Sequence, residues 1–225
     1  MQQYKREFID FMVQCGVLTF GDFVTKSGRS TPFFINTGNY RSGTQLVQLG
    51  SFYARALKTS LGSGFDVLFG PAYKGIPLVT LTAAKLAEEF GQDVPFCFNR
   101  KEVKDHGEGG SLIGYKPQDG DRVVIVEDVT TAGTSVRETV PILRAVADVQ
   151  IAGLIVSVDR QERGTTDKSA LAELQDEFGL TPIPIVTLDE IVQYLHNREV
   201  DGRVILDDEL LARINDYREK YGALD

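Results

Sequence analysis

The stretch from Val123 to Ser135 constrains the fold more than any other part of this chain. It opens with the β-branched run Val123 to Val126, bounded by polar residues, which is typical of a strand buried on both faces of a parallel sheet. Two carboxylates, Glu127 and Asp128, follow at the carboxyl end of this strand. A helix is then predicted to begin near Thr134. The residues between are mostly small or hydroxylated: Val129, Thr130, Thr131, Ala132, Gly133, Thr134 and Ser135.

This loop has the composition of a phosphate-binding site. Unpaired N–H groups and the positive end of the helix dipole attract anions at a helix N-terminus. Adjacent carboxylates suit ribose hydroxyls or a divalent metal. The alternative is that Asp128 and the threonines only cap the helix. A cap needs one such residue, whereas two acids and four hydroxyl residues lie within these nine positions, so we favour a ligand site.

Strands and helices alternate along most of the chain, which predicts an α/β fold with a Rossmann-like parallel sheet and helices on both faces. Ligands of such sheets gather at the carboxyl ends of the strands. The sequence predicts strands over residues 65–69, 94–99, 122–127, 150–158 and 183–188, and helices over 76–90, 134–147 and 168–178, and from a cap at Asp189 to about His196.

Residues 1–60 do not follow this alternation. They contain helical runs around a Gly/Ser/Thr-rich middle, and we expect an N-terminal hood and a first helix within the same compact unit. Residues 61–225 should form the core, with a flexible flap over 100–111. A terminal amphipathic helix is predicted over 207–221.

Charge and cysteine content exclude several classes of protein. The net charge of −8 argues against a general nucleic-acid-binding surface, which needs clustered Lys and Arg. No stretch reaches the roughly 18 apolar residues of a membrane span, and the N-terminus lacks the apolar run of a signal peptide. Cys15 and Cys97 stand apart among apolar neighbours, which indicates core thiols in a reducing compartment. We expect a cytoplasmic protein.

A second polar loop, from Gly70 to Pro77, also joins a predicted strand to a helix. Gly70 and Gly75 permit unusual backbone angles, Pro77 suits the first helical turn, and Lys74 places a cation among exposed N–H groups. Pyrophosphate would fit this loop. An ordinary turn with a solvated lysine is the alternative, and it loses weight because the 127–135 loop lies at the same edge of the sheet.

The third feature is a basic segment in an acidic chain. Three cations and a histidine occur between Arg100 and His106, and three glycines follow within four residues. A basic segment followed by glycines can form a mobile lid, which excludes water and brings positive charge to a leaving pyrophosphate. A solvated hairpin tip is the alternative.

These loops together resemble the orotate phosphoribosyltransferases, which are type I phosphoribosyltransferases, along essentially the whole chain. The 127–135 loop alone resembles the phosphoribosyl pyrophosphate (PRPP) signature that purine and uracil phosphoribosyltransferases share. The assignment to orotate depends on the flap, on the segment around Lys26 and on Arg160. The matching segments, in order, are Lys26 to Arg29, Gly70 to Pro77, Asn99 to Gly110, the 127–135 loop and Asp159 to Gly164.

The resemblance implies Mg²⁺-dependent transfer of phosphoribosyl from PRPP to orotate, which gives orotidine 5′-monophosphate and pyrophosphate in pyrimidine synthesis. Glu127 and Asp128 would contact ribose, and the 129–135 segment would hold its phosphate. Mg²⁺ would be held mainly by substrate and water. The residues implied around PRPP or pyrophosphate are Lys26, Tyr73, Lys74, Arg100, Lys101, Lys104 and His106, and those implied around orotate are Lys26, Phe34, Ile35, Thr131 and Arg160.

Catalysis in this picture needs charge stabilisation rather than a protein nucleophile. Glu127 and Asp128 would offset positive charge on ribose, and Lys101 and Lys104 would offset negative charge on pyrophosphate. His106 would either donate a proton to the leaving group or only a hydrogen bond to phosphate. The resemblance also implies a homodimer in which flap cations reach the neighbouring subunit's site.

The chain departs from the family pattern at two positions. Family members usually carry two aspartates where this chain has Glu127 and Asp128, and a second aromatic residue at Ile35. Glutamate keeps the charge, so we expect its role to remain. Backbone contacts would persist at Ile35, and a stacking role there is left open.

Two other functions compete with this reading. A purine phosphoribosyltransferase is the nearest, and Arg160 with Lys26 favours a carboxylated pyrimidine over it. A PRPP-sensing regulator without catalysis would keep the 127–135 loop, but the flap and the acidic surface argue against it. A dinucleotide enzyme is disfavoured because no GxGxxG opens a candidate helix.

Overall fold

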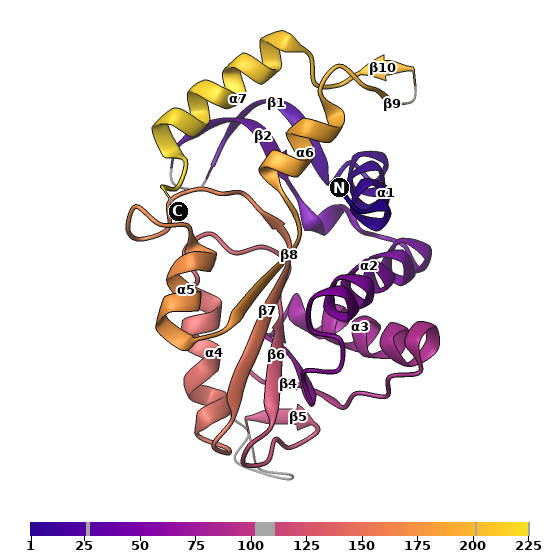
Figure 1. Ribbon diagram of the computed structural model, residues 1–225, viewed down its shortest axis with the longest axis vertical. Coiled ribbons are helices and arrows are strands. Elements are labelled where there is room, and N and C mark those ends of the chain that lie inside the picture. The colour runs from indigo at the N-terminus through magenta and orange to yellow at the C-terminus, as the bar shows by residue number, and fades with distance from the viewer. Residues whose placement is uncertain (26–27, 102–110, 201, 225) are drawn as a thin grey trace.

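The computed structural model describes residues 1–25, 28–101, 111–200 and 202–224. A mixed α/β architecture built on a six-stranded sheet confirms the predicted fold class (Figure 1). Its helices are α1 (Gln3–Gln14), α2 (Gly43–Leu61), α3 (Gly75–Phe90), α4 (Thr134–Arg144), α5 (Ala170–Phe178), α6 (Leu188–Leu195) and α7 (Asp208–Tyr221), with a short 3-10 helix η1 (Thr37–Asn39). Its strands are β1 (Leu18–Val24), β2 (Ser30–Ile35), β3 (Val67–Gly70), β4 (Phe96–Asn99), β5 (Leu112–Gly114), β6 (Arg122–Val126), β7 (Gln150–Asp159), β8 (Thr181–Thr187), β9 (Glu199–Val200) and β10 (Arg203–Val204).

The strand order of the central sheet is β5-β4-β3-β6-β7-β8. From β3 the chain moves outward to β4, and from β6 it moves the other way to β7 and β8. The order therefore reverses between β3 and β6, which pair in parallel. A crevice forms at such a switch point, outside the carboxyl ends of the strands. The two polar loops after β3 and β6 flank this crevice.

Helices cover both faces of the sheet, as the alternation predicts. Helices α2 and α3 lie side by side over one face, and α4 and α5 lie over the other (Figure 1). Each face has its own cluster of buried apolar side chains. Strand β6 contributes to both, because Val124 and Val126 pack on one side while Val123 and Ile125 pack on the other. This explains the uninterrupted valine and isoleucine run.

The hood lies beyond the carboxyl ends of the strands and draws on both ends of the chain (Figure 1). Strands β1 and β2 form an antiparallel hairpin, and α7 packs against β2. The ring of Phe33 meets the edge of the Tyr217 ring with 5.8 Å between centroids. The C-terminal helix, confirmed within one residue of its predicted start, therefore supports the N-terminal hairpin.

Three local features differ from expectation. Strand β5 runs antiparallel to β4, and its three residues closing the flap region were not predicted. The cap of α6 is Thr187, not Asp189, because Thr187 and Glu190 form a capping box. Neither Gly70 nor Gly75 has a positive φ. They are needed for space, because a Cβ on Gly75 would lie 2.7 Å from the carbonyl carbon of Gly70.

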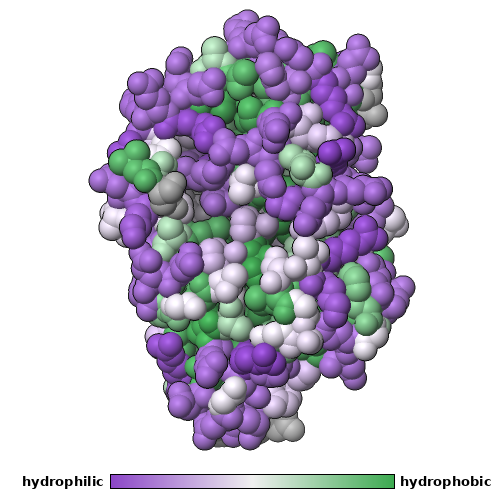
Figure 2. Space-filling model, in the orientation of Figure 1, coloured by the Kyte–Doolittle hydropathy of each residue, from purple (hydrophilic) through white to green (hydrophobic). Residues whose placement is uncertain are grey.

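The surface is mainly polar. On the face shown in Figure 2, hydrophilic residues form most of the outline, and apolar residues reach the surface in the middle. Within the described ranges, no helix combines the length and the apolar character that crossing a bilayer requires.

Candidate functional site

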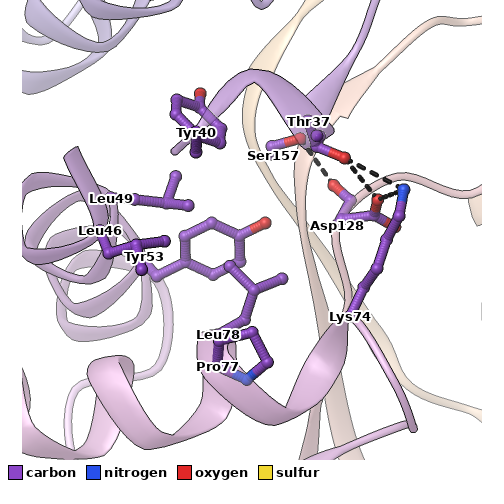
Figure 3. A pocket seen from close by; sticks show the side chains of 11 residues that line it. Thr37, Tyr40, Leu46, Leu49, Tyr53, Lys74, Pro77, Leu78, Asp128 and Ser157 are labelled. Carbon is purple, nitrogen blue, oxygen red and sulfur yellow. Dashed lines mark hydrogen bonds and ion pairs between the residues drawn. The ribbon is translucent and has the colours of Figure 1, made fainter. Parts of the chain in front are cut away.

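The crevice between β3 and β6 is bridged by an ion pair. Lys74, in the loop after β3, places Nζ 2.7 Å from Oδ2 of Asp128, which follows β6. Thr37 of the hood donates from Oγ1 to the same oxygen at 2.7 Å, and Lys74 also donates to Thr37 Oγ1 at 3.2 Å. Three segments distant in sequence therefore meet at one carboxylate (Figure 3).

Two buried hydroxyl groups hold the main chain of the acid pair. Tyr53 of α2, only 1% exposed, donates to the carbonyl oxygen of Glu127 at 2.8 Å. Ser157 of β7 donates from Oγ to the carbonyl oxygen of Asp128 at 2.6 Å, and its N–H donates to the same oxygen at 2.9 Å. These buried contacts fix the main chain of both residues, and their carboxylates contact Lys74, Thr37 and Ser135.

Glu127 is a buried carboxyl with one described side-chain donor, Ser135, whose Oγ donates to Oε2 at 2.7 Å. Burial, together with a smaller effect of the nearby Asp128 charge, raises the pKa of Glu127 to about 7, and the Ser135 hydrogen bond opposes the rise. The carboxyl is therefore poised to change its charge near neutral pH. Perturbation of this kind marks candidate functional groups.

The N-terminus of α4 carries no side-chain cap. Its N-cap residue is Gly133, in the left-handed region at φ +71°, which has no side chain to accept from the first turn. Thr130 instead accepts the Gly133 N–H at 3.1 Å. The capping explanation of the hydroxyl-rich loop is therefore wrong for this helix, and its first N–H groups are available to an anion.

The loop after β3 exposes the side chains of Tyr73 and Lys74 to solvent. The Ala72 N–H donates to Asn99 Oδ1 at 2.8 Å, and Pro77 lies in the first turn of α3 as expected. Tyr73 is 66% exposed, and Nζ of Lys101 lies 5.5 Å from the centroid of its ring. Lys101, at the base of the flap, therefore lies next to the loop expected to bind pyrophosphate.

A cavity of about 130 Å³ lies beside the ion pair. Thr37, Lys74, Asp128 and Ser157 form its polar side, and the Tyr53 ring faces it from α2 (Figure 3). An apolar wall lowers the local dielectric around a charge and strengthens its interactions. The remaining lining residues are Gly38, Tyr40, Leu46, Leu49, Pro77 and Leu78.

The predicted orotate residues that the structure describes lie after β6 (Thr131), after β7 (Arg160) and in β2 of the hood (Phe34 and Ile35). Arg160 and Thr131 line a common small cavity. The Arg160 guanidinium lies 4.6 Å from the centroid of Phe33, whereas the Phe34 ring stacks on Phe23 with 5.5 Å between centroids. Ile35 is buried in the core.

The remaining predicted residues lie either outside the described ranges or in described segments that follow β4, β6 and α6. Lys26, Lys104 and His106 lie outside the described residues, so their roles stay predictions. Arg100 follows β4, and its N–H donates to the carbonyl oxygen of Ser111 at 2.8 Å. Val129, Ala132 and Thr134 lie in the loop and first turn expected to hold phosphate. Outside the flap, His196 ends α6 and pairs with Asp208 at 2.8 Å.

Sequence reasoning did not identify four contributors to this region: Thr37, Tyr53, Ser157 and Glu162. Thr37 and Tyr53 bond to the acid pair from 91 and 74 residues away. No local pattern marks such partners. Glu162, which accepts from Arg160, was noted only as part of a matching segment.

The acid pair is the candidate for contact with a divalent metal. Within residues 1–25, 28–101, 111–200 and 202–224, no three His, Cys, Asp or Glu side chains form a group suited to a metal ion. The acid pair offers carboxylate oxygens beside an anion-binding loop. That arrangement fits Mg²⁺, which commonly binds one or two carboxylates together with substrate phosphates and water.

Comparison with known proteins places these features in a family. A family model described as "Phosphoribosyl transferase domain" matches residues 36–179. The chain is 58% identical over 223 residues to the orotate phosphoribosyltransferase of Clostridium beijerinckii, covering 99% of this chain and 100% of that protein.

Solved structures agree. The orotate phosphoribosyltransferase of Francisella tularensis is 35% identical with a TM-score of 0.83, covering 96% of this chain and all of that one. That of Mycobacterium tuberculosis in complex with PRPP is 19% identical with a TM-score of 0.60, covering 84% of this chain and 98% of that one, which supports the fold alone.

Proposed function

The chain belongs to the orotate phosphoribosyltransferases, pentosyltransferases of pyrimidine biosynthesis, and we propose that it transfers phosphoribosyl from PRPP to orotate, giving orotidine 5′-monophosphate and pyrophosphate. The observation that carries this proposal is the buried acid pair that meets Lys74 across the crevice. Next to it, the uncapped N-terminus of α4 offers N–H groups for the ribose phosphate. Opposite charges therefore face each other where ribose and pyrophosphate would separate.

The chemistry needs these charges in the transition state. As the bond from the anomeric carbon to pyrophosphate breaks, ribose gains positive charge and pyrophosphate gains negative charge. Glu127 and Asp128 would stabilise the first, and Lys74 and Lys101 the second. Before PRPP binds, Lys74 and Asp128 neutralise each other. PRPP would replace this contact, with ribose hydroxyls at Asp128 and phosphate oxygens at Lys74.

Mg²⁺ is proposed as the cofactor. When bound, it would supply positive charge to the pyrophosphate oxygens of PRPP. The chain's own contribution would come from Glu127 and Asp128, directly or through ribose hydroxyls and water. This fits the described residues, which contain no cluster able to enclose the ion alone.

Orotate is proposed to bind between the hood and the end of β7. Arg160 would pair with its carboxylate in the planar geometry that a guanidinium favours. Thr131 lines the same cavity, and Phe34 and Ile35 lie in β2 of the hood. Lys26, which lies outside the described residues, is proposed as a further orotate contact.

A spectrophotometric assay tests the activity. Orotate consumption, followed by its ultraviolet absorbance, should require both PRPP and Mg²⁺. Adenine and hypoxanthine in place of orotate test the purine alternative, and no product should form from them. PRPP binding without turnover of any base would favour a regulator and contradict the proposal.

We propose a homodimer in which the flap of one subunit closes on the partner's site. A mixture of the Lys101→Ala and Asp128→Asn variants, each nearly inactive alone, then regains activity after subunit exchange. Each mixed dimer has one intact site, and random pairing makes half the dimers mixed, so recovery should approach about a quarter of the parent activity. Verified exchange without recovery would mean that each flap serves its own subunit.

The cellular location is proposed from the thiols. Cys15 and Cys97 are free, and burial raises the pKa of Cys97 to about 12, which keeps that thiol protonated. Two unlinked thiols fit a reducing compartment such as the cytoplasm.

A further inference from the structure

Arg160 is already bound to a carboxylate within its own chain. Its Nε and Nη2 donate to Oε1 of Glu162 at 2.9 and 2.6 Å. Both side chains are shielded, with 14% of Arg160 and 10% of Glu162 exposed. Shielding makes such a pair stronger and more rigid than one in open solvent.

The backbone between these residues is shaped for this contact. Gln161 has φ +53°, a backbone conformation that residues other than glycine rarely adopt. Its N–H donates to Asp159 Oδ1 at 2.8 Å. Its side chain accepts from the Asp189 N–H and donates to Asp189 Oδ2, both at 2.9 Å. The turn that brings Arg160 and Glu162 together is therefore fixed on both sides.

Helix α7 reaches the same carboxylate. Tyr217 donates from its hydroxyl to Glu162 Oε1 at 2.9 Å. Burial raises the pKa of Tyr217, and the Glu162 charge raises it further, so the phenol remains a donor. The ring of Tyr217 also packs edge-on against Phe33, and Phe33 lies under the Arg160 guanidinium.

The end of the chain ties this loop down further. The Arg163 N–H donates to the carbonyl oxygen of Tyr221 at 3.0 Å, and the Ala223 N–H donates to that of Gln161 at 2.9 Å. Leu224 donates its N–H to the carbonyl oxygen of Asp167, also at 2.9 Å. The loop that carries Arg160 is therefore held by the C-terminal segment as well as by its own strand.

We propose that Glu162 and Tyr217 are positioning residues that orient the Arg160 guanidinium toward the carboxylate of the pyrimidine substrate. The inference rests on the proposed function, in which Arg160 pairs with orotate. Glu162 takes the Nε and Nη2 side of the guanidinium, and among the contacts that the structure describes this leaves the edge formed by Nη1 and the second N–H of Nη2 for a ligand. Phe33 and Glu162 together restrict rotation of the group, so less order is lost when the substrate binds.

A rival account makes Glu162 a competitor that occupies Arg160 until orotate displaces it. The two accounts predict opposite effects of removing the Glu162 charge. A competitor's loss would lower the KM for orotate, whereas the loss of a positioning residue raises it. The structure favours positioning because the Tyr217 hydroxyl and the fixed turn at Gln161 hold Glu162 in place.

The test measures steady-state kinetics of four variants with the full-length enzyme. Glu162→Gln keeps the shape and removes the charge, so the KM for orotate should rise about tenfold. Tyr217→Phe removes one hydroxyl, and a rise of about threefold is expected. The KM for PRPP should stay unchanged in both. Matched controls are Glu209→Gln, an exposed acid on α7, and Tyr221→Phe, whose described contacts involve its ring and main chain; both should retain the parent constants.

A double-mutant cycle separates positioning from general damage to the fold. In the Arg160→Leu background, Glu162→Gln should add no further rise in the KM for orotate. An undiminished effect in that background, equal rises for both substrates, or a lower KM for orotate overturns the inference. If Arg160→Leu itself leaves the KM for orotate unchanged, the proposed orotate contact fails. A rise from Arg160→Leu without one from Glu162→Gln removes the positioning role alone.

Discussion

Glu127 at the candidate site and Glu173 in the framework of the fold are two shielded carboxyl groups with different surroundings. Glu127 is 7% exposed and Glu173 is 8% exposed. Burial raises the pKa of Glu127 to about 7. Burial would also raise the pKa of Glu173, but hydrogen bonds from Thr166 and Thr165 lower it to about 2. The two side chains are equally shielded from solvent, but Glu127 lies deeper within the protein than Glu173, and their pKa values shift in opposite directions.

Depth within the protein, the nearby Asp128 charge and the number of donors together explain the difference. Glu173, on α5, accepts from the main-chain N–H and hydroxyl groups of Thr165 and Thr166 at 2.6 to 2.8 Å. Arg137 donates to it at 3.2 Å. Glu127 accepts from the Ser135 hydroxyl and from the Asp128 main-chain N–H, which are fewer donors than Glu173 has. Hydrogen bonds to the charged form lower a carboxyl pKa, and desolvation without them raises it.

The comparison distinguishes a carboxylate that fixes a loop, Glu173, from one that is suited to bind a ligand, Glu127. Glu173 holds the 163–169 loop against α5 and positions Arg137, which also donates to the carbonyl oxygen of Ala132 in the phosphate loop. All its oxygens are already engaged. Glu127 retains hydrogen-bonding capacity that ribose hydroxyls would satisfy. A carboxylate left short of donors at a strand end is therefore better suited to bind a ligand.

The largest expected effect comes from neutralising the acid pair. Glu127→Gln with Asp128→Asn should lower kcat by at least about 100-fold, because preorganised charges act mainly on the transition state. The free energy of unfolding should change little, since the partner Lys74 is 64% exposed and regains water. Steady-state kinetics and urea unfolding measure the two quantities.

The control for this variant removes two negative charges at exposed positions outside the acid pair. Glu138→Gln with Asp148→Asn changes exposed residues and should keep both kcat and stability. A kcat within a few-fold of the parent for the acid-pair variant would contradict its role in stabilising ribose.

The framework carboxylate should show the reverse pattern. Glu173→Gln should lower the free energy of unfolding by about 2 kcal/mol, because one amide group faces donors that a carboxylate satisfied. Its kcat should stay near the parent value. Glu177→Gln is the matched control, since Glu177 also pairs with Arg137 but is 44% exposed, and its loss should cost less than about 1 kcal/mol. A large fall in kcat without loss of stability would place Glu173 in the site.

The pH dependence of stability should distinguish the glutamates by sign. A raised pKa in the folded state means that the stability associated with Glu127 declines as pH rises from 4.5 through about 7. The lowered pKa of Glu173 means that its contribution is present above 4.5 and is lost as pH falls toward 2. Glu127→Gln should therefore gain stability relative to the parent as pH rises through neutral.

Urea unfolding of the parent and both single variants across this pH range measures the effect. Glu173→Gln should approach the parent in stability as pH falls below 4.5. Parallel curves for the parent and Glu127→Gln between 4.5 and 7 would show that Glu127 keeps an ordinary pKa.

The sequence was sufficient where chemistry and secondary structure are contiguous. The valine run, the acid pair and the 129–135 loop predict β6, the crevice edge and the start of α4 at Thr134. Each depends on interactions between residues close in sequence. The five parallel strands of the sheet follow from the same alternation, because parallel strands require crossover helices.

Contacts between distant elements could not be predicted. Thr37, Tyr53 and Tyr217 reach their carboxylates or carbonyls from distant segments whose sequence patterns do not indicate these partners. The hairpin β1–β2 was missed because its glycine and serine content hides the apolar alternation. Strand β5 is only three residues long, and it is defined by pairing with β4 rather than by composition.

The smallest expected effect concerns the donor that the hood supplies to the acid pair. Thr37 donates to Asp128 at 2.7 Å, and its contact is long-range, whereas the threonines on Glu173 lie seven and eight residues away in sequence. Thr37→Val preserves shape and removes this donor, so kcat/KM for PRPP should fall about threefold to tenfold. Thr37→Ser keeps the hydroxyl and should restore most of the loss. A fall as large as that of Asp128→Asn alone would mean that the hood, rather than the core, sets the position of this carboxylate. No change at all would leave Lys74 as the partner that orients it.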